Sequence, residues 1–498
     1  MKATIPAVLV TALLIIAAAF GLRPAAAADL PWWDTLWGYR VAVTVEANGY
    51  ARNDKVAEIP INFTDLLDAA GASGKFDPDS IRVLEVDNKG IIDDAVPFQF
   101  ERATNFNVGN NAAGVLLILM GGQTPASGAR QYHIYFDLSG DSFIVPQVSN
   151  RVSISTITDL YGYETFRLAT DNAVYHYHKT GGGFSSLYDV DEKDWIGWNP
   201  APRGGGDHRG IPNMVHPQDG GYFHPGRDNV DSGSPRRGPL RVTLRSTSRD
   251  GLWVTQWEIY PTFARLSVQK TAAGKAFWLL YEGPPGGTMD LATDLVTRPT
   301  ETGPVTTTVD ESWVGDIPGE EWAFFTDPAL GRSLFVHHQP DDAIVDYYTP
   351  STDKLMTVMG FGREVNNRFL TGLPQYLTVG LVDSITVEGV TAAIYDADKP
   401  LVVRLGEPEV GPEPPTPTPT LTPSPTATET VEPSPTPTVT STRKPTATPT
   451  GTATATSTAT ATMTVTATAT RVVTETPTPT ATQQPPSGVY LPVVIISQ

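Results

Sequence analysis

The chain has 498 residues, a formal net charge of −19, 44 prolines and no cysteine. Because there is no basic surplus to displace counterions from a phosphate backbone, we expect no nucleic-acid partner. The lack of cysteine excludes a disulfide framework, a thiolate zinc site and a cysteine nucleophile. The length allows two or three domains with sizeable cores.

Residues 1–28 have the pattern of a secretory signal peptide. Lys2 precedes an apolar stretch at 5–22, and the alanines at 26–28 supply the small residues of a cleavage site. An uncleaved membrane anchor is the alternative, because the apolar stretch is almost long enough to span a bilayer. Pro24 and the alanines favour cleavage, so we predict a secreted or cell-surface protein.

Residues 29–150 are predicted to form an N-terminal antiparallel β-sandwich. Short alternating segments separated by turn residues predict its strands at 39–45, 59–63, 81–86, 95–101, 114–120 and 131–138. Residues 66–72 are the best candidate for a short helix. The motifs in this region, including Tyr39-Arg-Val and Ile59-Pro-Ile-Asn-Phe, resemble N-terminal sandwich modules of secreted bacterial carbohydrate-active and surface proteins.

Residues 151–410 continue the strand pattern with longer loops. The predicted strands are 163–169, 173–178, 240–246, 253–260, 264–270, 275–281, 321–326, 333–338, 355–360 and 376–382. So many strands indicate a large two-sheet sandwich. The blocks Tyr175-His-Tyr-His, His208-Arg-Gly-Ile-Pro-Asn and Phe223-His-Pro-Gly resemble segments of secreted polysaccharide-processing proteins with a galactose-mutarotase-like fold. That resemblance implies a carbohydrate-active domain.

Histidines gather in one part of this second region. Five of the eight lie between residues 176 and 224. Alternate residues of a strand share a face, so His176 and His178 are expected to project together. The other three lie on a loop of residues 200–231, and a loop of that length in a compact domain is usually functional or disordered.

Imidazoles, arginines and aromatic rings in one segment predict a polysaccharide site. Arginine binds carboxylate or sulfate groups, rings stack on sugars, and a titratable side chain moves the proton. A lyase acting on uronic acids needs such a set. The candidate catalytic residues are His176, His178, His208, His216, His224 and Glu258. The candidate substrate-binding residues are Trp195, Arg209, Tyr222, Arg227 and Arg363.

Other interpretations of these residues stay open. We predict no required cofactor, but His176 and His178 with a third ligand such as Asp207 form an alternative site for zinc or another divalent metal. The same histidines also suit turn-stabilising and surface roles. Glu258 suits a solvated polar face, and Arg363 suits an interior ion pair.

Several familiar motifs are missing. The sequence has no P-loop, dinucleotide-binding glycine motif, His-Glu-x-x-His or Gly-x-Ser-x-Gly. Asp189-Val-Asp191 fits either a calcium loop or a turn, and a turn is favoured. Asp341 and Asp342 are expected to stabilise a turn, because neighbouring aspartates seldom face each other across a glycosidic bond.

Residues 411–488 form a stalk rich in Thr, Pro and Ala, in which large apolar side chains are nearly absent. Such a composition cannot bury a core and predicts disorder. The last ten residues, 489–498, are apolar and β-branched. The stalk and its Tyr-Leu-Pro end resemble the spacer and terminus of many secreted proteins of filamentous bacteria, which implies surface association, such as attachment to the cell envelope, or export sorting. A strand-like segment that docks on a partner or on its own domain is the alternative.

These observations predict a secreted, all-β protein with two sandwiches and a disordered stalk. The predicted function is a polysaccharide lyase or glycoside hydrolase acting on an extracellular glycan, with an anionic glycan as one option. The alternative is a non-catalytic carbohydrate-binding or cell-surface interaction protein. Convergence of the loop histidines and an arginine in one concave site would favour the enzyme.

Overall fold

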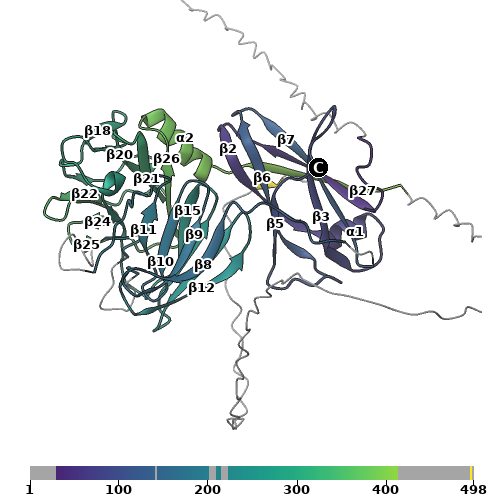
Figure 1. The fold of residues 1–498 in the computed structure, drawn as a ribbon, viewed down its shortest axis with the longest axis horizontal. Coiled ribbons are helices and arrows are strands. Elements are labelled where there is room, and N and C mark those ends of the chain that lie inside the picture. Colours follow the sequence, from purple (N-terminus) through teal and green to yellow (C-terminus); the bar gives the residue numbers. More distant parts are fainter. Residues whose placement is uncertain (1–29, 141–142, 201–208, 215–222, 413–493, 496–498) are drawn as a thin grey trace, which may run out of the picture. The chain divides into compact units, whose positions relative to one another are not determined.

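The computed structural model describes residues 30–140, 143–200, 209–214, 223–412 and 494–495. These residues form two β-sandwiches within one compact unit (Figure 1), which confirms the all-β prediction. No helix in the described part of the chain is both long and apolar enough to cross a membrane. The predicted signal peptide and nearly all of the predicted stalk lie outside the described residues.

The first sandwich consists of two sheets. One has the strand order β28-β27-β1-β7-β3-β4, and the other has the order β2-β6-β5. Its strands are β1 (Tyr39–Glu46), β2 (Arg52–Asn62), β3 (Phe76–Asp87), β4 (Gly90–Asp93), β5 (Phe98–Arg102), β6 (Ala113–Thr124), β7 (Ala129–Leu138), β27 (Val402–Val410) and β28 (Val494–Ile495). Alternate residues of β1 point into the core, as the period of two in the sequence predicts. Helix α1 (Phe63–Ala69) begins where the Asn62 side chain accepts the Thr64 N–H at 3.2 Å.

Strand β27 corrects the predicted boundary between the sandwiches. Its residues were expected to belong to the second sandwich, yet the strand pairs antiparallel with β1 (Figure 1, green among purple). Ion pairs at 2.7 Å between Arg40 and Glu409 and at 2.9 Å between Arg404 and Glu46 join the same two strands. The chain therefore returns to the first sandwich after completing the second.

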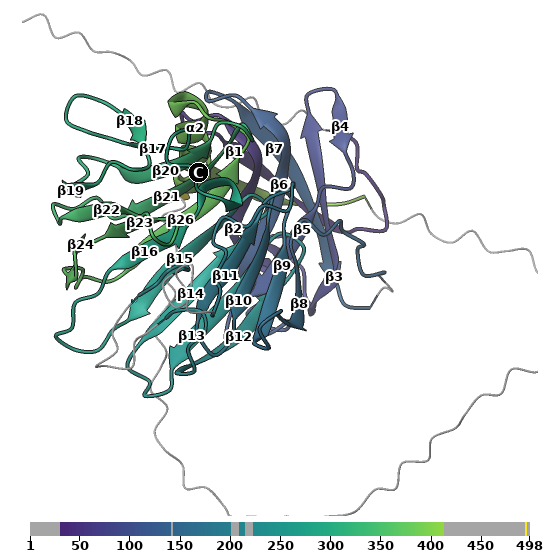
Figure 2. The same cartoon turned by 60° about the vertical axis from the view of Figure 1, so that its left-hand side comes forward.

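The second sandwich contains a nine-stranded antiparallel sheet with the order β12-β13-β14-β15-β26-β21-β20-β17-β18 (Figure 2). Its strands are β12 (Val230–Arg237), β13 (Val242–Ser248), β14 (Val254–Ile259), β15 (Phe263–Lys270), β17 (Leu295–Arg298), β18 (Val305–Thr308), β20 (Glu321–Asp327), β21 (Arg332–Gln339) and β26 (Gln375–Val382). Helix α2 (Val387–Asp398) follows β26 and buries Val390, Ile394 and Ala397.

Two four-stranded sheets, β11-β10-β9-β8 and β16-β23-β22-β19, complete the second sandwich. Their strands are β8 (Ser153–Thr158), β9 (Glu164–Ala169), β10 (Val174–His178), β11 (Gly183–Tyr188), β16 (Leu279–Gly283), β19 (Trp313–Gly315), β22 (Asp346–Ser351) and β23 (Met356–Phe361). A short 3₁₀ turn (Pro285–Gly287) and the small hairpin β24 (Arg363–Glu364) and β25 (Asn367–Arg368) are the remaining elements.

The segment around Gly210 bridges these two smaller sheets. Ile211 pairs with Phe184 of β11, and Gly210 pairs with Glu282 of β16. The strands of the two smaller sheets therefore form one layer, in the order β8, β9, β10, β11, β16, β23, β22 and β19. We call it the β8–β19 layer after its two edge strands. Its inner face contributes Tyr175, Tyr177 and other side chains to the core shared with the nine-stranded sheet. The side chains that alternate with these along each strand form its outer face.

A network centred on Arg241 joins the two sandwiches. The buried guanidinium donates to Glu101 at 2.6 and 3.0 Å, to Glu58 at 2.7 Å and to the Tyr260 hydroxyl at 2.9 Å. The Glu258 carboxylate lies 3.5 Å from the same guanidinium. Apolar residues of β2, β6, β20, β21 and α2 pack in the same interface. A buried arginine surrounded by acceptors holds its neighbours in fixed positions.

Candidate functional site

The outer face of the β8–β19 layer presents His176 and His178. Tyr175 and Tyr177 of β10 point into the hydrophobic core, so the two histidines project from the opposite face. This is the arrangement that the alternating sequence predicts. The two imidazoles nevertheless have different surroundings.

His178 is held by contacts on both ring nitrogens. Its Nε2 lies 2.7 Å from a carboxylate oxygen of Asp159, and its Nδ1 accepts the Gly226 N–H at 2.9 Å. The ring is 0% exposed and stacks on Tyr163, with centroids 4.6 Å apart. Burial lowers the pKa of His178, which favours the neutral ring. Both nitrogens are occupied, so the ring fixes the 223–226 segment and has no free nitrogen for a metal.

His176 is half-buried beside Tyr188, with ring centroids 5.3 Å apart. Burial lowers the pKa of its imidazole, against a raising effect from Asp194. Burial also raises the pKa of Tyr188, and Asp194 raises it further. His176, Tyr188 and Asp194 therefore form a half-exposed group of titratable side chains.

Trp195 and Arg209, two further sequence-predicted residues, are occupied by contacts of their own. Trp195 is 0% exposed, and its indole donates to Asp189 at 3.0 Å, so it has no open ring face for a sugar. The Arg209 guanidinium donates to the carbonyls of Gly197 at 3.4 Å and Lys354 at 2.6 Å. It therefore joins two loops.

The remaining members of the predicted histidine loop are only partly described. His224 is buried, with Nδ1 2.5 Å from the Pro225 carbonyl oxygen. Arg227 follows in the same turn, and its N–H donates to the His224 carbonyl at 3.3 Å. His208, His216, Tyr222 and Asp207 lie outside the described residues.

Glu258 lies in the interface between the sandwiches and away from the outer face of the β8–β19 layer. Its neighbour on one side is Trp257, which enters the core, so its own side chain turns toward Glu58 and Arg241. Burial raises the pKa of Glu258, while Arg241 opposes that rise. Its place in the Arg241 network indicates a structural role.

The acidic turns predicted from the sequence are also structural. Asp189 accepts the N–H groups of Asp191 and Lys193 at 2.9 Å each. It also pairs with Arg332 at 2.7 Å, and Asp191 lies 2.9 Å from the same guanidinium. These contacts form a turn anchored by an arginine, which agrees with the favoured interpretation of Asp189-Val-Asp191.

A carboxyl group that sequence analysis missed lies further along the same outer face. Glu282 of β16 is 6% exposed, and its Oε2 has no hydrogen-bond partner among the described residues. Burial raises the pKa of Glu282 from 4.5 to about 8, against the lowering effect of Arg363 and Lys354. The carboxyl group is therefore largely protonated at neutral pH and can donate a hydrogen bond.

Arg363 reaches this region because Gly360 leaves room for it. A Cβ at Gly360 would lie 2.6 Å from the Arg363 Cδ atom. The guanidinium lies over the rings of Trp278, at 5.1 Å, and Tyr347, at 5.3 Å. Its Nη1 is buried and has no hydrogen-bond partner among the described residues. We call Glu282, Arg363, Trp278 and Tyr347 the Glu282 site.

The Glu282 site combines two donors with aromatic surfaces. A protonated carboxyl and a guanidinium both donate hydrogen bonds, so together they are complementary to an anionic group. Strand β11 and the Gly210 segment lie between β10 and β16, so three strand spacings separate these two strands. That corresponds to about 14 Å between the backbones of His176 and Glu282. The predicted Arg363 therefore belongs to the site, whereas His176 lies apart from it.

A third group of side chains has the composition of a metal site. Ligand atoms of Glu321, His338 and Asp342 lie within 4.8 Å of one another, as do those of Asp316, Glu321 and Asp346. His338, however, already contacts Glu321 through Nδ1 and Gln375 through Nε2, the latter at 2.8 Å. Burial raises the pKa of Glu321 to about 9. A divalent cation would have to displace this proton.

Sequence signals for Glu282 were weak. The carboxyl follows the predicted strand 275–281 by one residue, and carboxylates are plentiful in this acidic chain. The charged groups that act on Glu282, Lys354 and Arg363, lie far along the chain. The Gly360-Phe-Gly-Arg363 segment was the one usable signal.

Comparisons with known proteins identify no family for this chain. No protein-family model matches it, and no curated protein matches it. Among solved structures, protein HI1317 matches with 12% identity and a TM-score of 0.34, over 46% of this chain and 100% of its own. A galactose mutarotase related enzyme from Lactobacillus acidophilus matches with 10% identity and a TM-score of 0.31, over 45% and 100% of the two chains. A galactose mutarotase-like protein from Lactobacillus casei matches with 12% identity and a TM-score of 0.30, over 46% and 100%.

Proposed function

We propose that the protein is a secreted carbohydrate-active enzyme that cleaves a uronic-acid polysaccharide as a lyase. The observation that carries this proposal is the Glu282 site. It holds a buried carboxyl with an unpartnered oxygen near an arginine with an unpartnered nitrogen, and the arginine lies beside two aromatic rings. Two donors of this kind suit the carboxylate of a uronic acid. Tyr347, which is half-buried, adds apolar surface for the sugar.

The reaction that fits these groups is β-elimination. Hydrogen bonds from Arg363 and protonated Glu282 withdraw charge from the substrate carboxylate, which acidifies the adjacent C5–H. A base removes that proton, the C5–H electron pair forms the C4=C5 double bond, and the C4–O bond to the leaving sugar breaks. The departing oxygen takes up a proton, so no water or other reactant is consumed. We assign both proton transfers to Tyr347, whose ring lies beside the Arg363 guanidinium: its phenolate oxygen removes the C5 proton, and the resulting hydroxyl gives that proton to the departing oxygen.

The test uses the full chain and a panel of uronic-acid and neutral polysaccharides. We expect ultraviolet absorbance from the C4=C5 double bond with a uronic-acid polysaccharide only. Arg363→Ala should lower kcat/KM at least 100-fold, because one charge-assisted contact to a buried anion is lost. Arg102→Ala, an exposed arginine of the first sandwich, is the matched control and should retain wild-type activity.

The role of Glu282 is tested separately. Because Gln resembles a protonated Glu and also donates a hydrogen bond, Glu282→Gln should keep most of the activity, and Glu282→Ala should not. Inactivity of Glu282→Gln with an active Arg363→Ala variant would identify Glu282 as a base and overturn the donor assignment.

A non-catalytic glycan-binding protein is the second candidate function. The specific observation in its favour is the saturation of His178, which removes one of the two strand histidines from acid-base chemistry. Binding of a polysaccharide without a new double bond or new reducing ends would establish this candidate. In either case, the expected location is outside the cell, with residues 411–488 as a stalk.

A further inference from the structure

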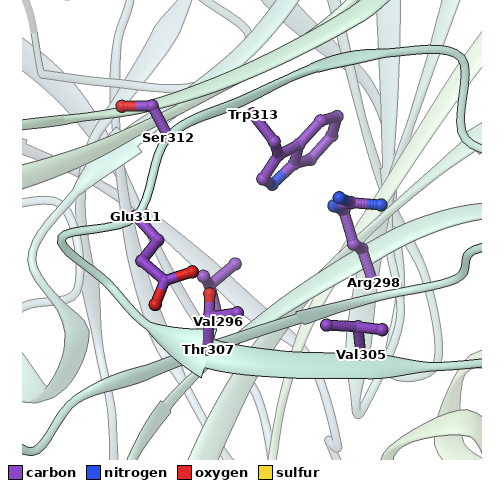
Figure 3. A pocket seen from close by; sticks show the side chains of 7 residues that line it. All are labelled: Val296, Arg298, Val305, Thr307, Glu311, Ser312 and Trp313. Carbon is purple, nitrogen blue, oxygen red and sulfur yellow. The ribbon is translucent and has the colours of Figure 1, made fainter.

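A pocket of about 210 Å³ lies on strands β17 and β18 and on the segment that leads into β19. None of these elements contributes to the Glu282 site. Two valines, Thr307 and Ser312 line the pocket together with three larger side chains, Arg298, Glu311 and Trp313 (Figure 3). Polar and apolar groups therefore face the same small space.

Trp313 and Arg298 hold each other in place on one side of the pocket. The Arg298 Cζ atom lies 4.3 Å from the centroid of the indole, a distance typical of a cation–π contact. The indole also stacks with Tyr348, with centroids 6.3 Å apart. Its Nε1 is buried without a hydrogen-bond partner among the described residues, and Figure 3 shows this nitrogen facing the pocket. The indole N–H is therefore a fixed donor.

Acceptors face these donors from the other side. Figure 3 shows the Glu311 carboxylate and the Thr307 hydroxyl directed into the pocket opposite Arg298 and Trp313. A sugar hydroxyl both donates and accepts hydrogen bonds, so neighbouring hydroxyls can bridge the two sides. Because Glu311 balances the charge of Arg298, an anionic ligand gains little here and a neutral one fits better.

We propose that this pocket, which we call the Trp313 pocket, binds one neutral sugar residue of a polysaccharide as an accessory subsite. The volume is below the 300–1,000 Å³ that is typical of sites for drug-sized ligands, which favours a single residue over an oligosaccharide. The glycan class rests on the proposed function, whereas the position of the subsite rests on these side chains alone.

The experiment is calorimetric titration of the full chain with glucose, galactose and mannose as neutral probes and glucuronate as the anionic probe. Trp313→Phe keeps a ring beside Arg298 but removes the indole N–H, and it should lower the affinity for the preferred neutral sugar about tenfold. Glu311→Gln should have a similar effect. Trp33→Phe in the first sandwich is the matched control and should bind as wild type. Thermal unfolding of each variant confirms that it is folded.

Unchanged affinity in both pocket variants, binding of no neutral sugar, or a preference for glucuronate would each overturn the proposal. Titrating the Arg363→Ala variant separates this proposal from the proposed function. Sugar binding should persist there even if no polysaccharide is ever cleaved. Loss of sugar binding in Arg363→Ala would place the ligand at the Glu282 site and contradict the subsite.

Discussion

Replacing Glu282 with Gln tests whether the fold holds this carboxyl in its protonated form. Burial raises the pKa of Glu282 from 4.5 to about 8. A carboxyl whose pKa is raised by folding contributes stability below the unfolded value, and that contribution is lost as pH rises through the folded value. Wild-type stability should therefore decrease between pH 4.5 and 8, because unfolding releases a proton that the folded state retains.

The magnitude follows from the size of the shift. Each pH unit between the two pKa values lowers the free energy of unfolding by about 1.4 kcal/mol, so about 3 kcal/mol is lost between pH 4.5 and 7. Gln cannot ionise, and it therefore removes this contribution while leaving all other titrating groups in place. The informative quantity is the difference in unfolding free energy between the wild type and Glu282→Gln at each pH.

Urea denaturation at pH 5, 6, 7, 8 and 9 measures this difference. We expect the Gln variant to gain stability relative to wild type by about 1.4 kcal/mol per pH unit up to pH 8 and to gain little above it. Glu407→Gln, at an exposed position of β27, is the control and should stay within about 0.5 kcal/mol of wild type throughout. Parallel curves for Glu282→Gln and wild type would refute the reasoning.

Three further outcomes follow from the packing. Arg241→Met leaves Glu101 buried without its main partner, so urea denaturation should show a loss of about 3–5 kcal/mol. His178→Ala removes two buried hydrogen bonds and should lower the midpoint of thermal unfolding. Its zinc content, measured by elemental analysis, should match that of the wild type. A loss of bound zinc in the variant would restore the metal interpretation. Gly283→Ala would place a Cβ 2.0 Å from the Trp195 carbonyl oxygen and should destabilise the protein by about 1–3 kcal/mol in the same denaturation assay.

The strands of the second sandwich were predictable wherever one face is buried. Alternation of apolar and polar residues located β15, β21 and β26 within one or two residues, because a period of two records which face enters the core. Helix α2 was missed. Gly389 and several β-branched residues lower its intrinsic helix propensity, although Val390, Ile394 and Ala397 have the spacing of a buried helical stripe.

Partners distant in the sequence were not predictable. A local pattern identifies β27 as a strand, but nothing in it says that its neighbour is β1, more than 350 residues earlier. The same reason explains the site. Period-two alternation placed His176 and His178 on one face, yet the Asp159 and Gly226 contacts that occupy His178 depend on how loops fold back over the sheet. The burial of Glu282 likewise depends on distant residues.

The contrast between two arginines separates structural from functional groups in this protein. Arg241 directs its nitrogens to Glu101, Glu58 and Tyr260 at hydrogen-bond distance, an arrangement that fixes the interface between the sandwiches. Arg363 lies against aromatic rings, and one of its nitrogens and an oxygen of Glu282 are buried and unpartnered among the described residues. Leaving buried polar groups without hydrogen bonds lowers the stability of the fold. A direct ion pair between Arg363 and Glu282 would give both the nitrogen and the oxygen a partner. Because departures from full pairing concentrate at functional sites, the Glu282 site is the better place to seek the activity, although the histidine cluster is more conspicuous in the sequence.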